Sequence, residues 1–231
     1  MASLITDRMR FLHLPKTGGT WVTQAIWAAG VDAVRPPSMP FHADLAETAA
    51  YDGRFTFACV RHPLEFWRSY WAYRMRDGWH PESEIDAAAA SPDLNEFARR
   101  VAASLPGAAG ALYEAFVGAP GAEIDFIGRH ERLADDVCTA LRLAGEPFDE
   151  RALRRHPAVN TSEYSGAAAW FEPDVARALA RSERAAIERF YPFEPIPRRL
   201  VRSPAREREH ARLRLLGRVR PRDREAQATQ G

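Results

Sequence analysis

Short apolar runs and stretches of helical periodicity follow one another along this chain. Residues 10–14 (RFLHL), 55–60 (FTFACV) and 124–127 (IDFI) are short, mainly apolar runs. Runs of this length are typical of strands that are covered on both faces. After each run, apolar residues recur at intervals of three and four, which predicts helices over 20–29, 63–74 and 131–144. Strands that alternate with helices predict an α/β domain with a central, mostly parallel sheet.

The rest of the pattern sets the extent of the domain. It predicts three further helices and is compatible with one more short strand; the helices cover 94–104, 111–117 and 175–190, and the strand 31–34. Three prolines follow the last periodic segment, so we expect one domain over residues 1–200. Residues 202–231 hold nine arginines against four acidic residues. We therefore expect 201–231 to be a basic C-terminal tail, partly helical and then flexible.

Composition narrows the class of protein. A hydrophobic fraction of 46% and a charged fraction of 27% are typical of globular chains, so disorder is not expected. No apolar run reaches the roughly 18 residues of a membrane span, and no leader is visible, which predicts a cytoplasmic protein. Cys59 and Cys138 have no metal-type spacing, so we expect no metal. The basic tail lacks aromatic residues, which predicts no nucleic-acid partner and at most weak contact with a membrane surface.

The loop after the first run, in FLHLPKTGGTW (residues 11–21), contains the only lysine among 32 lysine and arginine residues. Backbone N–H groups of a glycine loop that opens a helix form a cradle for anions. Lys16, Thr17 and Thr20 would add one charge and two hydroxyl groups. The lysine precedes both glycines, unlike the order GxxxxGK[ST] of the Walker A loop. The alternative is a tight turn with a solvent-facing lysine, but an arginine-rich chain has little need of a lysine for that. We predict a phosphate site in which a compact ammonium is required.

A second anion site is predicted after the run 55–60. Arg61 follows this run, and Ser69 lies eight residues on, two turns into the predicted helix. A guanidinium and a hydroxyl can together clamp a phosphate group. In parallel sheets, ligands bind outside the carboxyl ends of the strands. Two anion sites at neighbouring strand ends suit a nucleotide with phosphates at both ends of its ribose.

These motifs resemble those of sulfotransferases that use 3'-phosphoadenosine 5'-phosphosulfate, most closely the carbohydrate sulfotransferases of Golgi and bacterial type. The matching segments are HLPKTGGT (13–20), VRHP (60–63) with SYW (69–71), and FIGRHERL (126–133). The resemblance implies a P-loop-NTPase-like, three-layer α/β/α domain. It implies that Arg61 and Ser69 bind the 3'-phosphate and that the 5'-phosphosulfate is bound by Pro15, Lys16, Thr17, Gly18, Gly19, Thr20 and Trp21. Two positions depart from the family pattern, because His62 replaces the usual Asn or Asp and Phe66 replaces a frequent Arg.

Sulfuryl transfer to a hydroxyl requires a base near the acceptor and positive charge near the leaving oxygen. Lys16 can supply the charge, and we assign the base to His42, because relatives place a catalytic His or Glu in this part of the chain. The ordinary pKa of histidine, about 6.5, suits proton acceptance at neutral pH. The alternative for His42 is a loop histidine bonded to the backbone, with Asp44 and Glu47 as replacement bases. His13 is expected to orient the loop.

Other aromatic and histidine side chains receive weaker assignments. The aromatic residues between 66 and 73 have helical spacing and are expected in the core, although one ring could flank the adenine. No role is assigned to four histidines, His80, His130, His156 and His210. The acceptor is expected to be a carbohydrate or a small natural product.

Two other functions remain open on the sequence alone. A nucleoside-triphosphate kinase would share the strand, loop and helix, but it needs a Mg²⁺ site, typically with an Asp after a strand. Here the run 55–60 ends in Arg61 instead. A non-catalytic nucleotide-binding protein with the same fold would bind the nucleotide without transferring a group.

Overall fold

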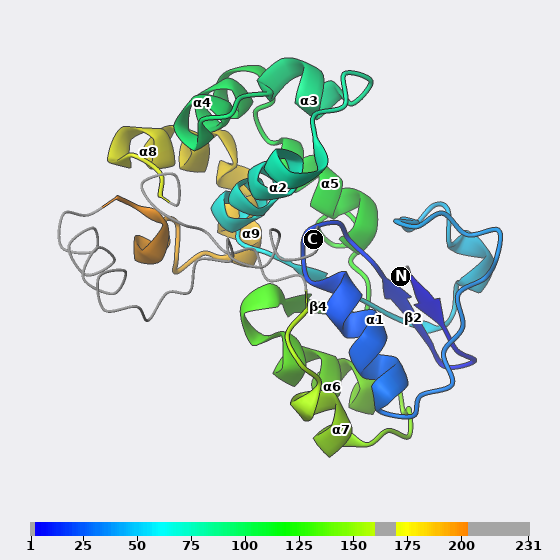
Figure 1. Cartoon of the computed structure of the whole chain (residues 1–231). Helices are drawn as coiled ribbons and strands as arrows, with labels where there is room; N and C mark the ends of the chain where they lie inside the picture. Colours follow the sequence, from blue (N-terminus) through cyan, green and yellow to red (C-terminus); the bar gives the residue numbers. More distant parts are fainter. Residues whose placement is uncertain (1–2, 160–169, 203–231) are drawn as a thin grey trace, which may run out of the picture.

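The computed structural model describes residues 3–159 and 170–202. Within them, four strands form one sheet in the order β1-β2-β3-β4 (Figure 1). The strands are β1 (Leu4–Ile5), β2 (Met9–Leu12), β3 (Phe55–Val60) and β4 (Phe126–Arg129). β2, β3 and β4 are parallel, and β1 pairs antiparallel with β2. The predicted α/β class with a mostly parallel sheet is confirmed, and the sheet is open.

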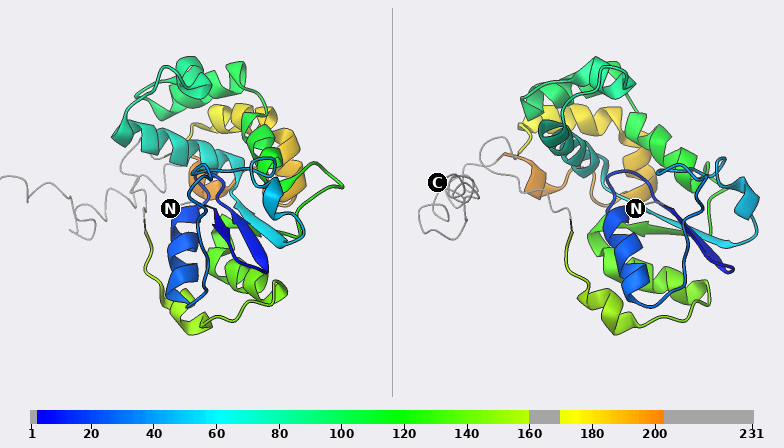
Figure 2. Two further views of the ribbon diagram at one scale, coloured as in Figure 1. Left: turned by 90° about the vertical axis from the view of Figure 1, so that its right-hand side faces the viewer. Right: turned by 45° about the vertical axis from the view of Figure 1, so that its right-hand side comes forward.

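Helices cover both faces of this sheet, as the two views of Figure 2 show. They are α1 (Gly19–Ala28), α2 (Pro63–Asp77), α3 (Glu84–Ala89), α4 (Leu94–Ser104), α5 (Ala108–Val117), α6 (Leu133–Leu143), α7 (Glu150–Arg155), α8 (Pro173–Ser182) and α9 (Arg184–Phe190), with single 3-10 turns at Ala49–Tyr51, His130–Arg132 and Arg198–Leu200. None of these helices is long and apolar enough to cross a bilayer.

Two apolar cores, one on each face of the sheet, explain why β3 is apolar at every position except Thr56. Phe57 and Cys59 point to one face, where they pack with side chains of α1, α6 and α7. Ala58 and Val60 point to the other face, toward α2, α4, α5, α8 and α9. A strand with a helical layer on each side has no polar face.

Several predicted boundaries are correct and others are shifted. The strand over 55–60 and the helix over 94–104 are confirmed. The strands predicted over 10–14 and 124–127 lie at Met9–Leu12 and Phe126–Arg129. Residues 31–34 form no strand; Val34 makes only a single bridge to Ile5.

The predicted helix 175–190 is wrong in one respect, because it is two helices that meet at Glu183. The backbone of Glu183 is not helical, with φ −101° and ψ 19°. Its carboxylate is fully buried and accepts hydrogen bonds from Trp67 Nε1 at 2.9 Å and from Ala109 N at 3.2 Å. These contacts, to α2 and to the first turn of α5, favour a break that a periodicity argument does not detect.

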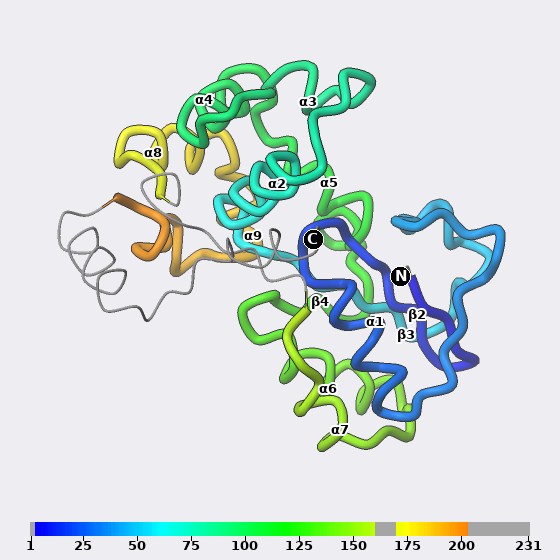
Figure 3. The backbone as a smooth tube through the Cα atoms, in the orientation of Figure 1, coloured from blue at the N-terminus to red at the C-terminus, as the bar shows by residue number. Residues whose placement is uncertain are grey.

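The parallel register brings three loops to one edge of the sheet. Leu12 lies opposite Ala58, and Ala58 lies opposite Ile127. Figure 3 traces the chain from the end of β2 into α1 and from the end of β3 into α2. The segments after Leu12, Val60 and Arg129 therefore emerge side by side. Of the predicted tail 201–231, residues 203–231 lie outside the described residues.

Candidate functional site

The loop between β2 and α1 has the backbone of an anion cradle. Lys16 has φ 62° and is the only non-glycine residue with positive φ in the described part of the chain. Gly18 follows with φ 89° and caps α1, and Thr17 Oγ1 donates to Leu14 O at 2.9 Å. No side chain caps α1, and its first turn contains no acidic residue. The free N–H groups and the helix dipole at this terminus favour a bound anion.

Two histidine rings pack against the glycines of this loop. A Cβ on Gly19 would lie 1.9 Å from His13 Cδ2, and a Cβ on Gly18 would lie 3.2 Å from His130 Cδ2. The loop can thus approach both rings only because these residues are glycines. His130, to which no role was assigned from the sequence, directly follows β4 at the carboxyl edge of the sheet, and that position after a strand is the signal that could have singled it out. Burial, together with the nearby charge of Arg61, lowers the pKa of His130 to about 4, so its ring is neutral.

The Lys16 side chain lies among other cations on the last turns of α2. Its Nζ is 4.1 Å from the centroid of the Tyr73 ring. The guanidinium groups of Arg74 and Arg76 lie 5.3 and 5.7 Å from the same centroid. Burial, and after it repulsion from Arg76, Arg61 and Arg74, lower the pKa of Lys16 to about 8. An anion bound here would relieve that repulsion.

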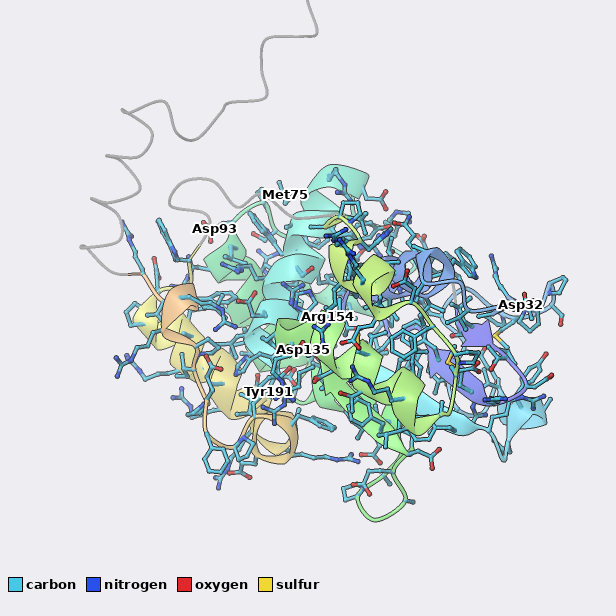
Figure 4. The ribbon with its side chains drawn as sticks, turned by 90° about the horizontal axis from the view of Figure 1, so that it is seen from below. Asp32, Met75, Asp93, Asp135, Arg154 and Tyr191 are labelled. Atoms are coloured by element: carbon cyan, nitrogen blue, oxygen red, sulfur yellow. The ribbon has the colours of Figure 1, made fainter. Side chains whose placement is uncertain are left out.

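The placement of Tyr73 corrects the expectation for the aromatic residues of α2. Phe66, Trp67 and Trp71 are buried in the core as predicted, and Tyr70 is half-buried. Tyr73 instead stacks under Lys16. The end of the helix is open to solvent, as Met75, labelled in Figure 4 and 46% exposed, shows.

Arg61 connects the loop to α2. Its Nη1 donates to Lys16 O at 3.2 Å, and its Nη2 lies 3.4 Å from Glu65 Oε2. Its buried Nε has no hydrogen-bond partner among the described residues. Glu65, Ser69 and Tyr73 follow at four-residue intervals and so share one face of α2. The predicted pair Arg61 and Ser69 thus lies on either side of Glu65 in the sequence, and Ser69 is 5% exposed.

Glu65 is the acidic residue that the sequence reasoning missed. Its side chain is 6% exposed and contacts three guanidinium groups, those of Arg61, of Arg68 at 2.9 Å and of Arg199 at 3.0 Å. Burial alone would raise the pKa of Glu65, but the three arginines outweigh it and lower the pKa. Glu65 is therefore ionised and neutralises part of the charge around Arg61.

His62, a departure from the family pattern, has a structural role. Its Nδ1 accepts from Leu64 N at 3.2 Å, and its Nε2 donates to Glu194 O at 2.8 Å. Its ring packs edge-on against Tyr191, which Figure 4 labels, with centroids 4.9 Å apart. Burial lowers the pKa of His62 to about 4, so the ring stays neutral. His62 thus caps α2 as Asn or Asp would.

His42 is oriented by the loop itself. Its Nδ1 lies 2.8 Å from His13 O. Because a carbonyl only accepts, Nδ1 carries the proton, and the neutral ring presents Nε2 as an acceptor. Burial lowers the pKa of His42; the bond to His13 O opposes this, and the charge of Lys16 adds to it. His42 is thus bonded to the backbone through Nδ1, and this bond leaves Nε2 as the basic atom of the ring.

The replacement bases are held in a turn of their own. Asp44 N donates to Glu47 Oε2 at 3.1 Å, and Glu47 N donates to Asp44 Oδ1 at 3.0 Å. These reciprocal bonds give both carboxylates a local structural role. His42 therefore remains the best candidate for the base.

Trp21, the last residue of the predicted phosphate loop, faces another segment. Its Nε1 donates to His156 O at 3.3 Å, and the two rings lie 6.0 Å apart. Pro15, Thr20 and Trp21 are half-buried.

Neither the cavities nor the comparisons with known proteins change the choice of candidate site. A cavity of about 510 Å³ lies at the opposite edge of the sheet and is lined by residues such as Arg10, Thr56 and Asp125. In the described ranges, no three His, Cys, Asp or Glu residues form a group that could hold a metal ion.

Comparisons with protein-family models, with curated proteins and with solved structures gave no match.

Proposed function

We propose that this chain is a sulfotransferase that uses 3'-phosphoadenosine 5'-phosphosulfate, on a P-loop-NTPase-like, three-layer fold. The observation that carries the proposal is the contact between the two predicted anion sites. Arg61 Nη1 donates to the carbonyl of Lys16, so one guanidinium joins the glycine loop to the face of α2 that bears Ser69. Two cationic sites at adjacent strand ends suit a nucleotide with phosphates at both ends of its ribose.

The residues present fit such a donor, which supplies a sulfuryl group to an acceptor hydroxyl when bound. The uncapped N-terminus of α1 and the ammonium of Lys16 would hold the 5'-phosphosulfate. Arg61 and Ser69 would hold the 3'-phosphate, since Arg61 retains unused donors.

The chemistry of the chain's own groups follows from their protonation states. His42 Nε2 accepts the proton of the acceptor hydroxyl, because Nδ1 is already protonated toward His13 O. Lys16 stabilises the charge that develops on the leaving oxygen. The acceptor is a carbohydrate or a small natural product.

A binding experiment separates this function from a kinase. Isothermal titration would compare adenosine 3',5'-bisphosphate with ATP plus Mg²⁺. We expect the bisphosphate to bind more tightly, because β3 is followed by Arg61 and not by an acidic metal ligand. Tighter binding of ATP with Mg²⁺ would contradict the proposal.

A transfer experiment separates an enzyme from a binding protein. Candidate acceptors would be incubated with the protein and the phosphosulfate donor and screened by mass spectrometry for the gain of a sulfate group. A sulfated product that is absent with Lys16→Ala supports the proposal. Tight bisphosphate binding with no transfer to any acceptor, including those of a cell extract, would favour a non-catalytic role.

A further inference from the structure

The carboxylate of Glu65, which contacts Arg61 and stands one helical turn before Ser69, raises a problem for a phosphate that Arg61 and Ser69 would bind. Glu65 Oε2 is shared by Arg68 Nη2 at 2.9 Å and Arg61 Nη2 at 3.4 Å. An ionised carboxylate next to a phosphate site repels the ligand and competes for the same guanidinium. For Arg61 to bind a phosphate, the attraction between Glu65 and Arg61 must be weakened by another positively charged side chain.

Arg199 does this from a distant part of the chain. Its Nε donates to Glu65 Oε1 at 3.0 Å, and its Nη1 lies 3.1 Å from Glu194 Oε1. Arg199 and Glu65 are 134 positions apart in the sequence. With Arg199 on Oε1 and Arg68 on Oε2, both carboxylate oxygens are engaged, and Arg61 is left with the longest of the three contacts.

The segment that carries Arg199 is anchored independently of this ion pair. Leu200 is fully buried, and its carbonyl accepts from Phe171 N at 2.8 Å. Arg202 N donates to Phe171 O, also at 2.8 Å. The Arg199 side chain itself is 46% exposed, so its substitution should not disturb the core.

We propose that Arg199 is a positioning residue of the 3'-phosphate subsite: it engages Glu65 so that Arg61 is left to contact the ligand. This inference rests on the proposed function. Loss of Arg199 would leave Glu65 Oε1 without its guanidinium partner, with only Arg68 and Arg61 to balance the carboxylate. Arg61 would then turn toward Glu65, and the 3'-phosphate would be repelled.

The test measures affinity for two nucleotides that differ only in the 3'-phosphate, adenosine 3',5'-bisphosphate and adenosine 5'-monophosphate. We expect Arg199→Gln to weaken bisphosphate binding about tenfold, within the range of couplings between contacting charges. Monophosphate binding should change less than about twofold, and Arg199→Lys should restore most of the bisphosphate affinity. The matched control is Arg154→Gln. Arg154 is 41% exposed and contacts Asp135, beside which Figure 4 shows it, and Glu150, neither of which belongs to the proposed subsite.

A double-mutant cycle tests whether Arg199 acts through Glu65. In a Glu65→Gln background, Arg199→Gln should change bisphosphate affinity less than about twofold. An unchanged tenfold loss in that background would mean that Arg199 acts on the ligand directly and would overturn the inference. If Glu65→Gln does not fold, the selectivity of Arg199→Gln and the rescue by Arg199→Lys decide by themselves.

Failure of the inference and failure of the proposed function look different. Equal weakening of both nucleotides by Arg199→Gln, with normal wild-type preference for the bisphosphate, would overturn the positioning role alone. A wild-type protein that binds neither nucleotide would overturn the proposed function, and this inference with it.

Discussion

The positive charges at the two edges of the sheet have opposite surroundings. At the amino edge, Arg10 is 4% exposed and donates to Thr48 O, Thr56 Oγ1 and Asp52 Oδ1. At the carboxyl edge, Lys16 makes no ion pair with any described residue and is crowded by arginines that lower its pKa. A cation surrounded by acceptors stabilises the fold, whereas a cation surrounded by other cations can bind an anionic ligand.

Cavity size and the crowding of positive charge around Lys16 point to opposite edges of the sheet. The cavity of about 510 Å³ lies beside Arg10, Asp52 and Thr56, whose polar groups already bond to one another. A large cavity is a common default for a binding site. Here Lys16, which makes no ion pair with any described residue, lies at the other edge, where an anionic ligand would be stabilised by Lys16 and its neighbouring arginines.

The largest effect should come from His42, if the carboxyl edge carries the chemistry. His42→Ala should lower turnover with the acceptor found by mass spectrometry by about 10²- to 10⁴-fold, as loss of a general base does. Because the pKa of His42 is lowered, the wild-type rate should rise with pH over a range below 6.5 and then level off.

The control for this change is Asp44→Asn in the neighbouring turn, which should keep most of the activity. Near-normal turnover of His42→Ala would show that another group takes the proton. Thermal unfolding of both variants would check that the fold is retained.

An exchange of cations at the carboxyl edge should have the next largest effect. Lys16→Arg keeps the charge but replaces a compact ammonium with a planar guanidinium, in a space bounded by Tyr73, Arg74 and Arg76. Turnover should fall by about 10²- to 10³-fold, the loss typical of a preorganised electrostatic donor. Full activity of this variant would mean that the single lysine has no special role.

The reverse exchange at the amino edge should affect stability and not turnover. Arg10→Lys keeps the charge but cannot donate to Thr56, Thr48 and Asp52 in the same geometry. We expect the free energy of unfolding, measured with urea, to fall by about 1–3 kcal/mol, the cost of buried groups left unpaired. Bisphosphate affinity should stay within about twofold of wild type. A selective loss of ligand binding would abolish the contrast between the edges.

The sequence predicted the parts of the molecule that depend on local pattern. The run 55–60 is apolar at every position except Thr56 because a helical layer covers each face, so its bounds were found correctly. β1 was missed because two residues, Leu4 and Ile5, are too few to show a period. The break at Glu183 was missed because its cause lies in contacts with Trp67 and Ala109.

The candidate site was predictable to the same extent. Lys16, Arg61 and Ser69 stand in motifs next to strand ends, so a local reading places them at one edge. Glu65 and Arg199 were not predictable, because the residues that meet are 134 positions apart and an Arg or Glu is ordinary at either position. Tyr73 was assigned to the core because helical spacing alone does not tell which ring faces a loop.

The smallest expected effect concerns pH and tests the charge at the carboxyl edge directly. The pKa of Lys16 is lowered to about 8, so its ammonium is present below that pH and is lost as the pH rises above it. A bound phosphate favours the charged form, so binding above pH 8 takes up a proton. Bisphosphate affinity should therefore be flat from pH 6.5 to 7.5 and fall by about tenfold per unit above pH 8.

Lys16→Met separates this titration from that of the ligand and of other groups. The variant should bind the bisphosphate more weakly, but with an affinity that no longer changes between about pH 8 and 9.5. Proton uptake, measured by titration in buffers of different ionisation enthalpy, should disappear with it. The same pH profile in wild type and variant would mean that the ammonium does not hold the phosphate, and that the two edges differ less than their contacts suggest.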